Sequence, residues 1–449
     1  MNRTNVSRRA FIRASSAAGA GWLILRSGTF ASAASPSNTL NVALIGAGGR
    51  ATAHFEALRA ENVVALCDVD ANALSSAARH FPRARHYDDW RRCLEQKDID
   101  AVVCSTTDHT HAFVAQWAMN RGKHVYLEKP IAISVEEARL LRATYLGNRH
   151  KLATQVGTQR HALGNFQRVR ELIRDGAIGR LQDVHVWLND AFTRSGYLPA
   201  AGAPPHSLRW DLWLGPASGD HPYNPGYFAG DRPGFNCGNW NKFWDFGTGE
   251  VGNWGSHTMD LAWQAIEGDL PTHAEAIGDP FHPEVAPSKL VMTFTLPPNS
   301  WRDAIRLRWY QGGGLPNAPR PFVDLSKIKH GVLFKGDKGA VVADFNSRLI
   351  IPAGDSSDMT HYRRRETADI LPPHPHFQRQ WIEACKGSLR TSCDFDYSGR
   401  IMETLLVGLA AWRAGGNVIY DGGTGQAVGS PAAAEFFRRS YRAGWPLNG

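Results

Sequence analysis

Cysteine is scarce in this chain of 449 residues. Cys67 and Cys104 fall in apolar runs and should pack in the core. Cys385 and Cys393 are close enough in sequence to pair in an oxidising compartment, and the sequence leaves that pairing open. Six scattered cysteines exclude a disulfide framework or a zinc site, and we predict no metal centre. The six are Cys67, Cys93, Cys104, Cys237, Cys385 and Cys393.

Long hydrophobic runs and a strong excess of one charge are also absent. The apolar stretch from Ala14 to Leu25 is too short to span a bilayer and is followed by Arg26. The formal net charge is +8, but residues 1–33 contain five arginines and no acid, which leaves +3 for the rest. That balance does not indicate a nucleic-acid-binding protein. A composition of 43% hydrophobic and 20% charged residues is typical of a soluble globular enzyme, and the length allows two domains.

The first 33 residues show the features of a twin-arginine export signal, in the right order. Residues 7–13 form the twin-arginine motif, a modest apolar stretch follows, and Ala31-Ser32-Ala33 is a small-residue cleavage site. We predict recognition by the Tat export machinery, cleavage after Ala33 and a soluble periplasmic mature protein. No cysteine stands at that site to be lipidated, so we expect no stable membrane anchoring. A disordered basic tail is the alternative, but it does not explain the order of the features.

Residues 39–51 form an apolar strand that breaks into a glycine-rich turn and then into a helix beginning near Gly49. This order of elements is typical of a Rossmann dinucleotide-binding fold. Gly46 permits the tight turn and Gly48 lets a pyrophosphate approach the backbone. Ala51 replaces the usual third glycine and still allows close helix packing. The N-terminus of the helix would then face the phosphates.

The second apolar strand, residues 63–67, ends at Asp68. A carboxylate at this position can accept hydrogen bonds from both ribose hydroxyls of an adenosine, and it would repel a 2′-phosphate. We therefore expect NAD, with NADP as the second choice. Arg50 weakens this preference, because a guanidinium in the glycine turn could lie near a 2′-phosphate and offset the repulsion.

From Asp68 to residue 156 the pattern alternates helices and strands, which predicts a parallel, doubly wound sheet within a domain of residues 38–157. Ligands bind such sheets at the carboxyl ends of the strands, where Asp68, Thr106 and Lys129 fall. The elements expected are helices at 71–80 and 88–96, a strand at 101–105, a helix at 111–121, a strand at 124–128, a helix at 135–149 and a strand at 151–156.

Residues 158–449 follow a different pattern, which predicts an α/β domain with a large, mostly antiparallel sheet. Residues 191–249 form a long insertion rich in Pro, Gly and aromatic residues. Its aromatic side chains could stack on sugar faces, and Trp240 is our candidate, although most of them should form a local core. We expect strands at 184–189, 290–295, 304–310 and 331–345, and helices at 165–175, 377–386, 399–413 and 432–443.

Four motifs together resemble the glucose-fructose oxidoreductase / inositol dehydrogenase (Gfo/Idh/MocA) family over residues 40 to about 270. They are the glycine turn, Thr106-Thr107-Asp108-His109-Thr110-His111, Glu128-Lys129-Pro130, and the segment Gly252 to Asp260, which reads GNWGSHTMD. The resemblance implies a Rossmann domain, a second domain whose open sheet face could form a homo-oligomer, and sugar or cyclitol substrates. It also implies a cofactor site that includes Gly46, Gly48, Gly49, Arg50, Asp68, Thr106, His111, Glu128 and Lys129.

The resemblance brings Lys129 and His257 together at the reacting hydroxyl. Oxidation of a secondary alcohol needs a base that takes the hydroxyl proton while hydride leaves the carbon. A neutral imidazole or a lysine with a lowered pKa can serve, since a cationic nicotinamide and burial both disfavour an ammonium. We assign His257 as the proton acceptor and Lys129 as the group that orients and polarises the oxygen. The reverse assignment stays open.

Asn253 departs from the family pattern, which commonly has aspartate four residues before the histidine. Asn can bind a sugar, but it cannot hold a proton or stabilise an imidazolium as a carboxylate would. Asp260 either compensates for this loss or is a structural hydrogen-bonding group. Arg160, in the segment that resembles the hinge into the second domain, either contacts substrate hydroxyls or forms an interdomain salt bridge.

An exported Rossmann enzyme has to acquire its nucleotide before export, so we expect tightly bound NAD that is regenerated in place. The predicted function is oxidation of a secondary hydroxyl of a sugar or glycoside, either with return of the hydride to a second substrate or with net oxidation. The alternative is an NAD-dependent glycosidase that oxidises, eliminates, adds water and re-reduces. That cycle needs another base, for which Tyr227, His206 and Asp245 are candidates. Lys129 and His257 disfavour a non-catalytic sugar sensor.

Overall fold

The computed structural model describes residues 23–24, 30–31, 38–228, 239–354, 358–372 and 376–449, and it divides into two units, Met1–Thr39 and Leu40–Gly449. In the first unit, strands β1 (Leu23–Ile24) and β2 (Phe30–Ala31) pair antiparallel. The twin-arginine motif and the cleavage site predicted after Ala33 lie outside the described residues. No helix in the described ranges has the length and apolar character needed to cross a membrane.

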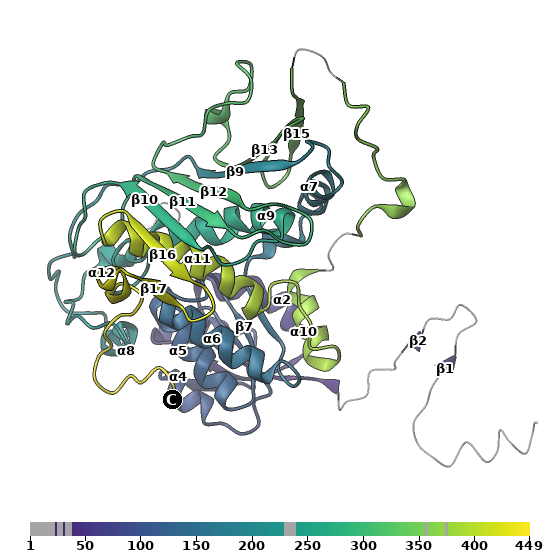
Figure 1. Cartoon of the computed structure of the whole chain (residues 1–449). Helices are drawn as coiled ribbons and strands as arrows, with labels where there is room; N and C mark the ends of the chain where they lie inside the picture. The colour runs from purple at the N-terminus through teal and green to yellow at the C-terminus, as the bar shows by residue number, and fades with distance from the viewer. Residues whose placement is uncertain (1–22, 25–29, 32–37, 229–238, 355–357, 373–375) are drawn as a thin grey trace, which may run out of the picture. The chain divides into compact units, whose positions relative to one another are not determined.

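The second unit begins with six parallel strands: β3 (Asn41–Ile45), β4 (Asn62–Cys67), β5 (Arg85–Tyr87), β6 (Ala101–Cys104), β7 (His124–Leu127) and β8 (Thr154–Val156). Their order in the sheet is β5-β4-β3-β6-β7-β8. The chain starts on central β3, builds outward to β5, and then returns to the other side of β3 with β6; β7, the strand next to β6, is labelled in Figure 1. This order confirms the predicted doubly wound sheet, which binds ligands where the strand order reverses.

Helices cover both faces of this sheet. One face packs against a buried cluster that includes Phe113 and Leu141, and the other against a cluster that includes Leu58 and Trp381. Trp381 belongs to α10 (Phe377–Lys386), so a helix that we assigned to the second domain packs on the first sheet. The other helical segments here are η3 (Gly49–His54), α2 (Phe55–Leu58), α3 (Ala71–Ala78), α4 (Trp90–Leu94), α5 (Asp108–Asn120) and α6 (Val135–Asn148).

A second sheet has nine strands: β9 (Leu181–Leu188), β10 (His273–Gly278), β11 (Leu290–Leu296), β12 (Ile305–Gln311), β13 (His330–Gly336), β14 (Gly339–Ala343), β15 (Arg348–Pro352), β16 (Asn417–Asp421) and β17 (Gln426–Val428). Their order is β15-β14-β13-β9-β12-β11-β10-β16-β17. Strands β9 and β12 pair parallel and the other neighbours antiparallel. The prediction of a large, mostly antiparallel sheet is confirmed.

Two predicted elements differ from the structure. The single strand expected at 331–345 is a hairpin of β13 and β14, because residues 337–338 turn the chain and Gly339 takes a φ of +158° that favours glycine. The helix expected at 432–443 is limited to α12 (Pro431–Glu435). Beyond it, Phe437 is buried in the main core, so tertiary packing overrides the helical pattern.

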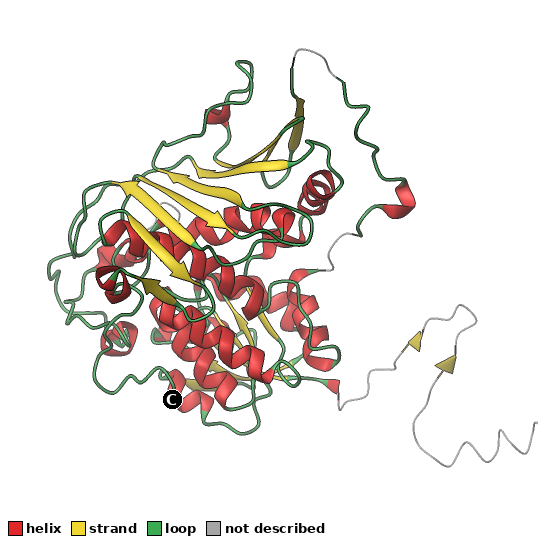
Figure 2. Ribbon diagram, in the orientation of Figure 1, coloured by secondary structure: helices red, strands yellow, loops and turns green. Residues whose placement is uncertain are grey.

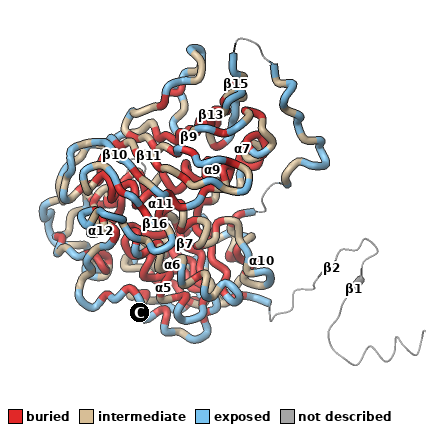
Figure 3. The backbone as a smooth tube through the Cα atoms, in the orientation of Figure 1, coloured by how far each residue is buried: buried red, intermediate tan, exposed pale blue. Residues whose placement is uncertain are grey.

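Three long helices pack on one face of the nine-stranded sheet (Figure 2): α7 (Gly164–Arg174), α9 (Ser256–Ile266) and α11 (Phe395–Arg413). Every residue of α9 is buried, and the tube in Figure 3 shows buried backbone along α11 as well. A π-helical turn, η7 (Val251–Gly255), leads into α9. The shorter segments are η4 (Gln159–Ala162), α8 (Trp210–Leu214), η5 (Pro225–Phe228), η6 (Trp240–Lys242), η8 (Leu325–Lys327) and η9 (Thr367–Asp369).

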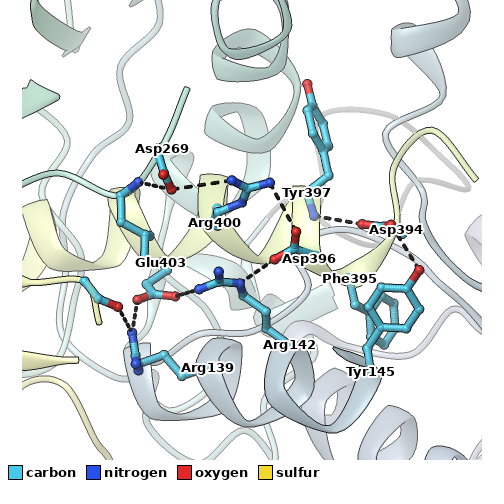
Figure 4. Close-up of polar contacts among 12 residues, drawn as sticks. Arg139, Arg142, Tyr145, Asp269, Asp394, Phe395, Asp396, Tyr397, Arg400 and Glu403 are labelled. Carbon is cyan, nitrogen blue, oxygen red and sulfur yellow. Dashed lines mark hydrogen bonds and ion pairs between the residues drawn. The ribbon is translucent and has the colours of Figure 1, made fainter. Parts of the chain in front are cut away.

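Helices α6 and α11 join the two sheets through ion pairs (Figure 4). Arg139 Nη1 lies 2.5 Å from Glu403 Oε1, and Arg142 Nε donates to Asp396 Oδ1 at 2.6 Å. The Glu403 side chain is fully buried, so its charge depends on these arginines for compensation. The network therefore links the dinucleotide-binding half of the molecule to the helix layer under the second sheet.

We expect Glu403→Ala to lower the free energy of unfolding by about 3 kcal/mol, because it leaves the partly buried Arg139 guanidinium without its carboxylate. Asp98→Ala is the matched control. The Asp98–Arg85 pair is exposed, at 51% and 44%, and its loss should cost less than ~1 kcal/mol. Equilibrium urea unfolding of the three proteins measures both changes. Equal losses in the two variants would contradict the structural role of Glu403.

Candidate active site

The glycine turn after β3 has no room for side chains at two positions. Gly46 has a φ of +78°, and a Cβ there would lie 2.6 Å from the Ser105 carbonyl carbon. A Cβ on Gly48 would lie 2.9 Å from the Cβ of Ala73. At Gly49, where η3 begins, a Cβ would meet no atom within 4 Å. The backbone is therefore bare where a pyrophosphate has to approach, which fits NAD.

Asp68 lies at the end of β4, directly against this turn. Its Oδ2 accepts hydrogen bonds from the backbone N–H groups of Ala47 (2.8 Å) and Gly48 (3.1 Å), and Oδ1 accepts one from Asp70 N at 3.0 Å. Burial raises the pKa of Asp68, and the three backbone donors oppose that shift. The carboxylate is thus held beside the turn, in the position where a ribose diol binds in this fold.

We expect Asp68→Ala to weaken NAD binding about tenfold to a hundredfold, because hydrogen bonds to a charged group contribute about 1.5–3 kcal/mol. The variant should lose its preference for NAD over NADP at the same time. Asp70→Ala is the control, since Asp70 only caps α3 through Asn72 N. Fluorescence titration with NADH and NADPH measures both effects. An unchanged NADH affinity in Asp68→Ala would contradict this assignment.

Glu128, at the end of β7, is a buried carboxylate with two basic partners. Its Oε1 lies 3.0 Å from His54 Nε2 and 2.9 Å from Arg50 Nε. Burial alone would raise its pKa, but the hydrogen bonds and charges of His54 and Arg50 lower it to about 2. A Cβ on Gly157 would lie 2.6 Å from Glu128 Oε2, so the glycine makes room for this carboxylate. Glu128 thereby anchors the turn helix to the strand that carries Lys129.

Arg50 is therefore directed toward Glu128. With the amide of Gln159 oriented so that its oxygen faces Arg50, that oxygen accepts a hydrogen bond from Arg50 Nη2 at 2.8 Å. These contacts differ from our expectation that Arg50 offsets the repulsion between Asp68 and a 2′-phosphate. The physical reason is the strong attraction between the Arg50 guanidinium and the buried Glu128 carboxylate. The second partner of Glu128, His54, was not indicated by the sequence patterns.

Thr106 lies in the connection between β6 and α5, and His111 lies in the first turn of α5. The two ring nitrogens of His111 face the carbonyl oxygens of Pro130 (2.7 Å) and Thr106 (3.0 Å). Burial lowers the pKa of His111, so the neutral ring donates to one of them. His111 thus ties together the loops after β6 and β7. Asp108, in the same motif, has its pKa raised to about 7 by burial, with the Lys129 charge acting in the opposite direction.

Lys129 is held by the π-helical turn before α9. Its Nζ donates to Asn253 Oδ1 at 2.8 Å, and Asn253 Nδ2 in turn donates to Glu250 Oε2 at 3.3 Å. Burial raises the pKa of Glu250, and the Asp190 charge acts in the same direction. Position 253 carries an amide instead of a carboxylate, and the nearest carboxylate in this chain of hydrogen bonds is that of Glu250, on the other side of Asn253. Only its closeness to Asn253 in sequence could have indicated Glu250.

His257 stands in the first turn of α9, one helical turn after Asn253. Its side chain is buried, with the residue 6% exposed, and Nδ1 has no hydrogen-bond partner among the described residues. Burial lowers the pKa of His257 well below its usual range, and the charges of Lys129 and Arg160 add to that effect. A neutral imidazole with an unpaired ring nitrogen, close to the Lys129 ammonium, can accept a proton.

Asp260 lies on α9 but its carboxylate is bound to other residues than His257. Asp260 Oδ1 is 2.9 Å from His161 Nδ1 and accepts a 2.5 Å hydrogen bond from the Tyr397 hydroxyl. Among the described residues, His161, Asp260 and Cys393 form a buried group of potential metal ligands within 4.8 Å of one another. The short His161–Asp260 contact is that of a direct ion pair, and it joins η4 to α9, while Tyr397 adds a contact from α11.

Arg160, in η4, packs against two aromatic rings. Its guanidinium carbon lies 5.2 Å from the ring centre of Trp254 and 4.5 Å from that of Phe345. The His330 ring lies 4.2 Å from Trp254 and stacks on Phe345 at 5.2 Å. Sequence patterns did not single out His330, in β13, and Phe345, in the turn between β14 and β15, because both lie more than 70 residues beyond Trp254.

The other predicted contacts lie in separate surroundings. Trp240 is only 4% exposed and belongs to a local core of the insertion, which also contains Tyr227. Asp245 is bound to His221 at 2.6 Å, and His206 is exposed. The structure therefore brings together Lys129, Asn253, His257 and Arg160, and it gives Trp240 and the three additional candidate bases other partners or surroundings.

Residues 40–156 match the family model GFO_IDH_MocA, described as an oxidoreductase family with an NAD-binding Rossmann fold. The inositol 2-dehydrogenase of Salmonella typhimurium is 28% identical over 153 residues, which cover 33% of this chain and 45% of that protein. A glycosyl hydrolase family 109 protein of Saccharopolyspora erythraea is 29% identical over 211 residues, which cover 39% of this chain and 44% of that protein. The matched segments thus span less than half the length of these relatives.

The fold extends further than the sequence likeness. An inositol dehydrogenase homolog from Azotobacter vinelandii, solved with NADH and myo-inositol, superposes with a TM-score of 0.55 at 17% identity, covering 85% of this chain and 98% of that one. At this identity the likeness concerns the fold, and it includes the second sheet. The glycine turn, the position of Asp68 and the matching family model together show that residues 40–156 form an NAD-binding Rossmann fold similar to that of the Gfo/Idh/MocA oxidoreductase family.

Proposed function

We propose that this protein is an NAD-dependent oxidoreductase that acts on a secondary hydroxyl of a sugar or glycoside. The observation that carries the proposal is the arrangement of Lys129 and His257. Asn253 holds the ammonium of Lys129 one helical turn before the neutral, unpaired imidazole of His257. This pair meets the two needs of alcohol oxidation, a proton acceptor and a group that stabilises developing negative charge on oxygen.

Bound NAD would supply the hydride acceptor. The glycine turn and Asp68 would hold its adenosine and pyrophosphate ends. The His257 imidazole would take the hydroxyl proton, while the Lys129 ammonium would donate a hydrogen bond to the same oxygen and lower the energy of the alkoxide. Burial of His257 would keep bulk water away from the developing charge.

The glycosidase cycle remains the second candidate because of Glu250. That cycle needs an additional base that removes a proton from the carbon beside the transient ketone. Glu250 is linked to Lys129 through Asn253, and burial raises its pKa. A carboxylate with a raised pKa is a stronger base than an ordinary one. The likeness of part of the chain to a glycosyl hydrolase family 109 protein agrees with this alternative.

The export prediction completes the proposal. The twin-arginine motif in residues 7–13 supports passage through the Tat machinery, cleavage near Ala33 and a periplasmic location. The mature enzyme would then carry its NAD from the cytoplasm and hold it tightly. N-terminal sequencing of the protein from a periplasmic fraction tests the cleavage site. A start at Met1 in that fraction, or recovery of the protein from the cytoplasm alone, would contradict the export proposal.

The decisive experiment incubates purified mature protein, without added nucleotide, with a panel of sugars and glycosides, and reads product masses. Loss of two hydrogens, or a matched pair of reduced and oxidised sugars, supports the oxidoreductase. Hydrolysis without net oxidation supports the glycosidase instead. A requirement for added NAD contradicts tight cofactor binding. Lys129→Met, processed in parallel, identifies products that arise from contaminating enzymes.

A further inference from the structure

Arg160 is a half-buried guanidinium that has no carboxylate partner among the residues that the structure describes. Its two close neighbours are the rings of Trp254 and Phe345. Burial lowers the pKa of Arg160, and the nearby charge of Arg50 acts in the same direction. Cation–π contacts stabilise a guanidinium, but they leave its five N–H donors available for hydrogen bonds. A half-buried, unpaired arginine on the wall of a site is therefore ready to bind an anion.

The position of Arg160 makes this anion part of the substrate site. Trp254, on which Arg160 lies, is one helical turn from His257, and the two rings are 5.8 Å apart. The charge of Arg160 also contributes to the low pKa of His257 and, after burial, to the pKa of about 4 of His330. Arg160 is thus close to the reacting centre, on the side formed by η7 and the second sheet.

None of the carboxyl groups around the site is paired with Arg160 in the described part of the chain. Glu128 is paired with Arg50, and Asp190 lies 2.5 Å from the ammonium of Lys329. Glu250 accepts a hydrogen bond from Asn253, and burial raises the pKa of Asp108 to about 7. Lys129 is held by a neutral amide, so its positive charge is also not neutralised by a direct carboxylate contact in the described part of the chain.

We propose that Arg160 forms an anion subsite and that the substrate is an acidic sugar or glycoside, with a carboxylate, sulfate or phosphate group on the side of the ring away from the oxidised carbon. This inference rests on the proposed function. The planar guanidinium binds such oxygens with two parallel hydrogen bonds, and Trp254 and Phe345 hold it in a fixed orientation. The same chemistry would also bind the pyrophosphate of the cofactor, so the experiment has to separate the two sources.

The test compares matched pairs of ligands on the NAD-loaded protein by isothermal titration calorimetry. The pairs are methyl glucoside with methyl glucuronide, methyl galactoside with methyl galacturonide, and each neutral glycoside with its 6-sulfate and its 6-phosphate. At least one acidic member should bind about tenfold to a hundredfold more tightly than its neutral partner, and Arg160→Gln should abolish that difference. Arg160→Lys should retain part of it, because a lysine keeps the charge but not the paired donors.

Arg174→Gln is the matched control, because Arg174 also lies over a tryptophan, Trp301, but is paired with Glu267 at 2.6 Å. It should keep the preference for acidic ligands. No preference in any wild-type pair would overturn the proposal. A weaker NADH affinity in Arg160→Gln, with an unchanged preference for acidic over neutral ligands, would also overturn the proposal. In that case the anion bound by Arg160 would be the pyrophosphate of the cofactor. Hydride transfer to the bound NAD is measured separately. If acidic ligands bind more tightly but no ligand is oxidised, the result contradicts the proposed function. If neutral and acidic sugars are oxidised at equal rates, the result contradicts only the inference about Arg160.

Discussion

Lys129→Met is expected to lower kcat on any substrate about 10²- to 10⁴-fold, the range typical of a group that acts in proton transfer or oxyanion stabilisation. Methionine has a similar length and fills the space of the lysine, but it cannot donate a hydrogen bond to the reacting oxygen. It would also leave Asn253 Oδ1 without its 2.8 Å partner. The loss should therefore appear in the chemical step and not in the melting temperature.

Lys329→Met is the control for Lys129. Lys329 also lies near the site, beside His330, but its ammonium is more than half exposed and binds Asp190. Single-turnover reduction of the bound nucleotide by a saturating substrate is the measurement, with NADH fluorescence as the signal. Because Lys129 is also a predicted cofactor contact, NAD affinity is measured in parallel. Retention of more than a tenth of the wild-type rate in Lys129→Met would contradict the assigned role.

His257→Gln is expected to lower kcat by a similar factor, about 10²- to 10⁴-fold, because glutamine can hydrogen-bond a hydroxyl but cannot take its proton. His206→Gln is the control, since His206 is exposed and lies in the insertion. A rate loss in His257→Gln together with unchanged NAD affinity identifies a chemical role. An unchanged rate would make Lys129 the proton acceptor, which is the reverse assignment.

The low pKa of His257 also predicts how kcat depends on pH. Burial, Lys129 and Arg160 lower the pKa of His257, so the imidazole stays in its neutral, basic form down to pH values below 6.5. The acidic limb of the wild-type kcat profile that belongs to His257 should therefore lie below pH 6.5, and it should be missing in His257→Gln. A limb above pH 7 that disappears with His257 would contradict the low pKa.

The same shift makes the fold sensitive to acid. A histidine whose pKa is lower in the folded state than in the unfolded state binds fewer protons when folded, so its contribution to stability is complete above the unfolded pKa near 6.5 and is lost as the pH falls. His257 shares this direction with five other buried or partly buried histidines: His109, His111, His124, His185 and His330. Burial lowers the pKa of His109 to about 3, and that of His185 and His330 to about 4. The contribution of these histidines to the free energy of unfolding should therefore decrease between pH 6.5 and 5, whereas Asp108, whose pKa burial raises to about 7, acts in the opposite direction.

Where the family resemblance led us to expect an aspartate, Asn253 links Lys129 to Glu250. A carboxylate at 253 would pair directly with Lys129. Here the neutral amide accepts from Lys129 and donates to Glu250, so the negative charge acts at a greater distance. The attraction between Lys129 and the nearest carboxylate is weaker as a result, which leaves more positive charge for an anionic substrate or a developing alkoxide.

The parts that sequence patterns predicted well are local. The glycine turn needs a positive φ at Gly46 and a bare backbone at Gly48, and no other residue type satisfies both. Alternating strands and helices between residues 39 and 156 required a parallel sheet, whose carboxyl ends bring Asp68 and Lys129 to one edge. These features follow from steric limits and from hydrophobic periodicity within short segments, so a single sequence shows them.

Tertiary structure decided which groups those side chains meet. Arg50 binds Glu128, 78 positions away, and Asp260 binds His161 and Tyr397, while Arg160 has no carboxylate at all in the described ranges. A charged residue pairs with the opposite charge that lies nearest to it after folding. Burial strengthens this pairing because it removes water that would compete for the same hydrogen bonds. The sequence by itself determined that residues 40–156 form a dinucleotide-binding fold, and the family resemblance predicted a lysine and a histidine at one site. Only the packing of distant segments decided which of its charges are neutralised and which one is left to bind an anion.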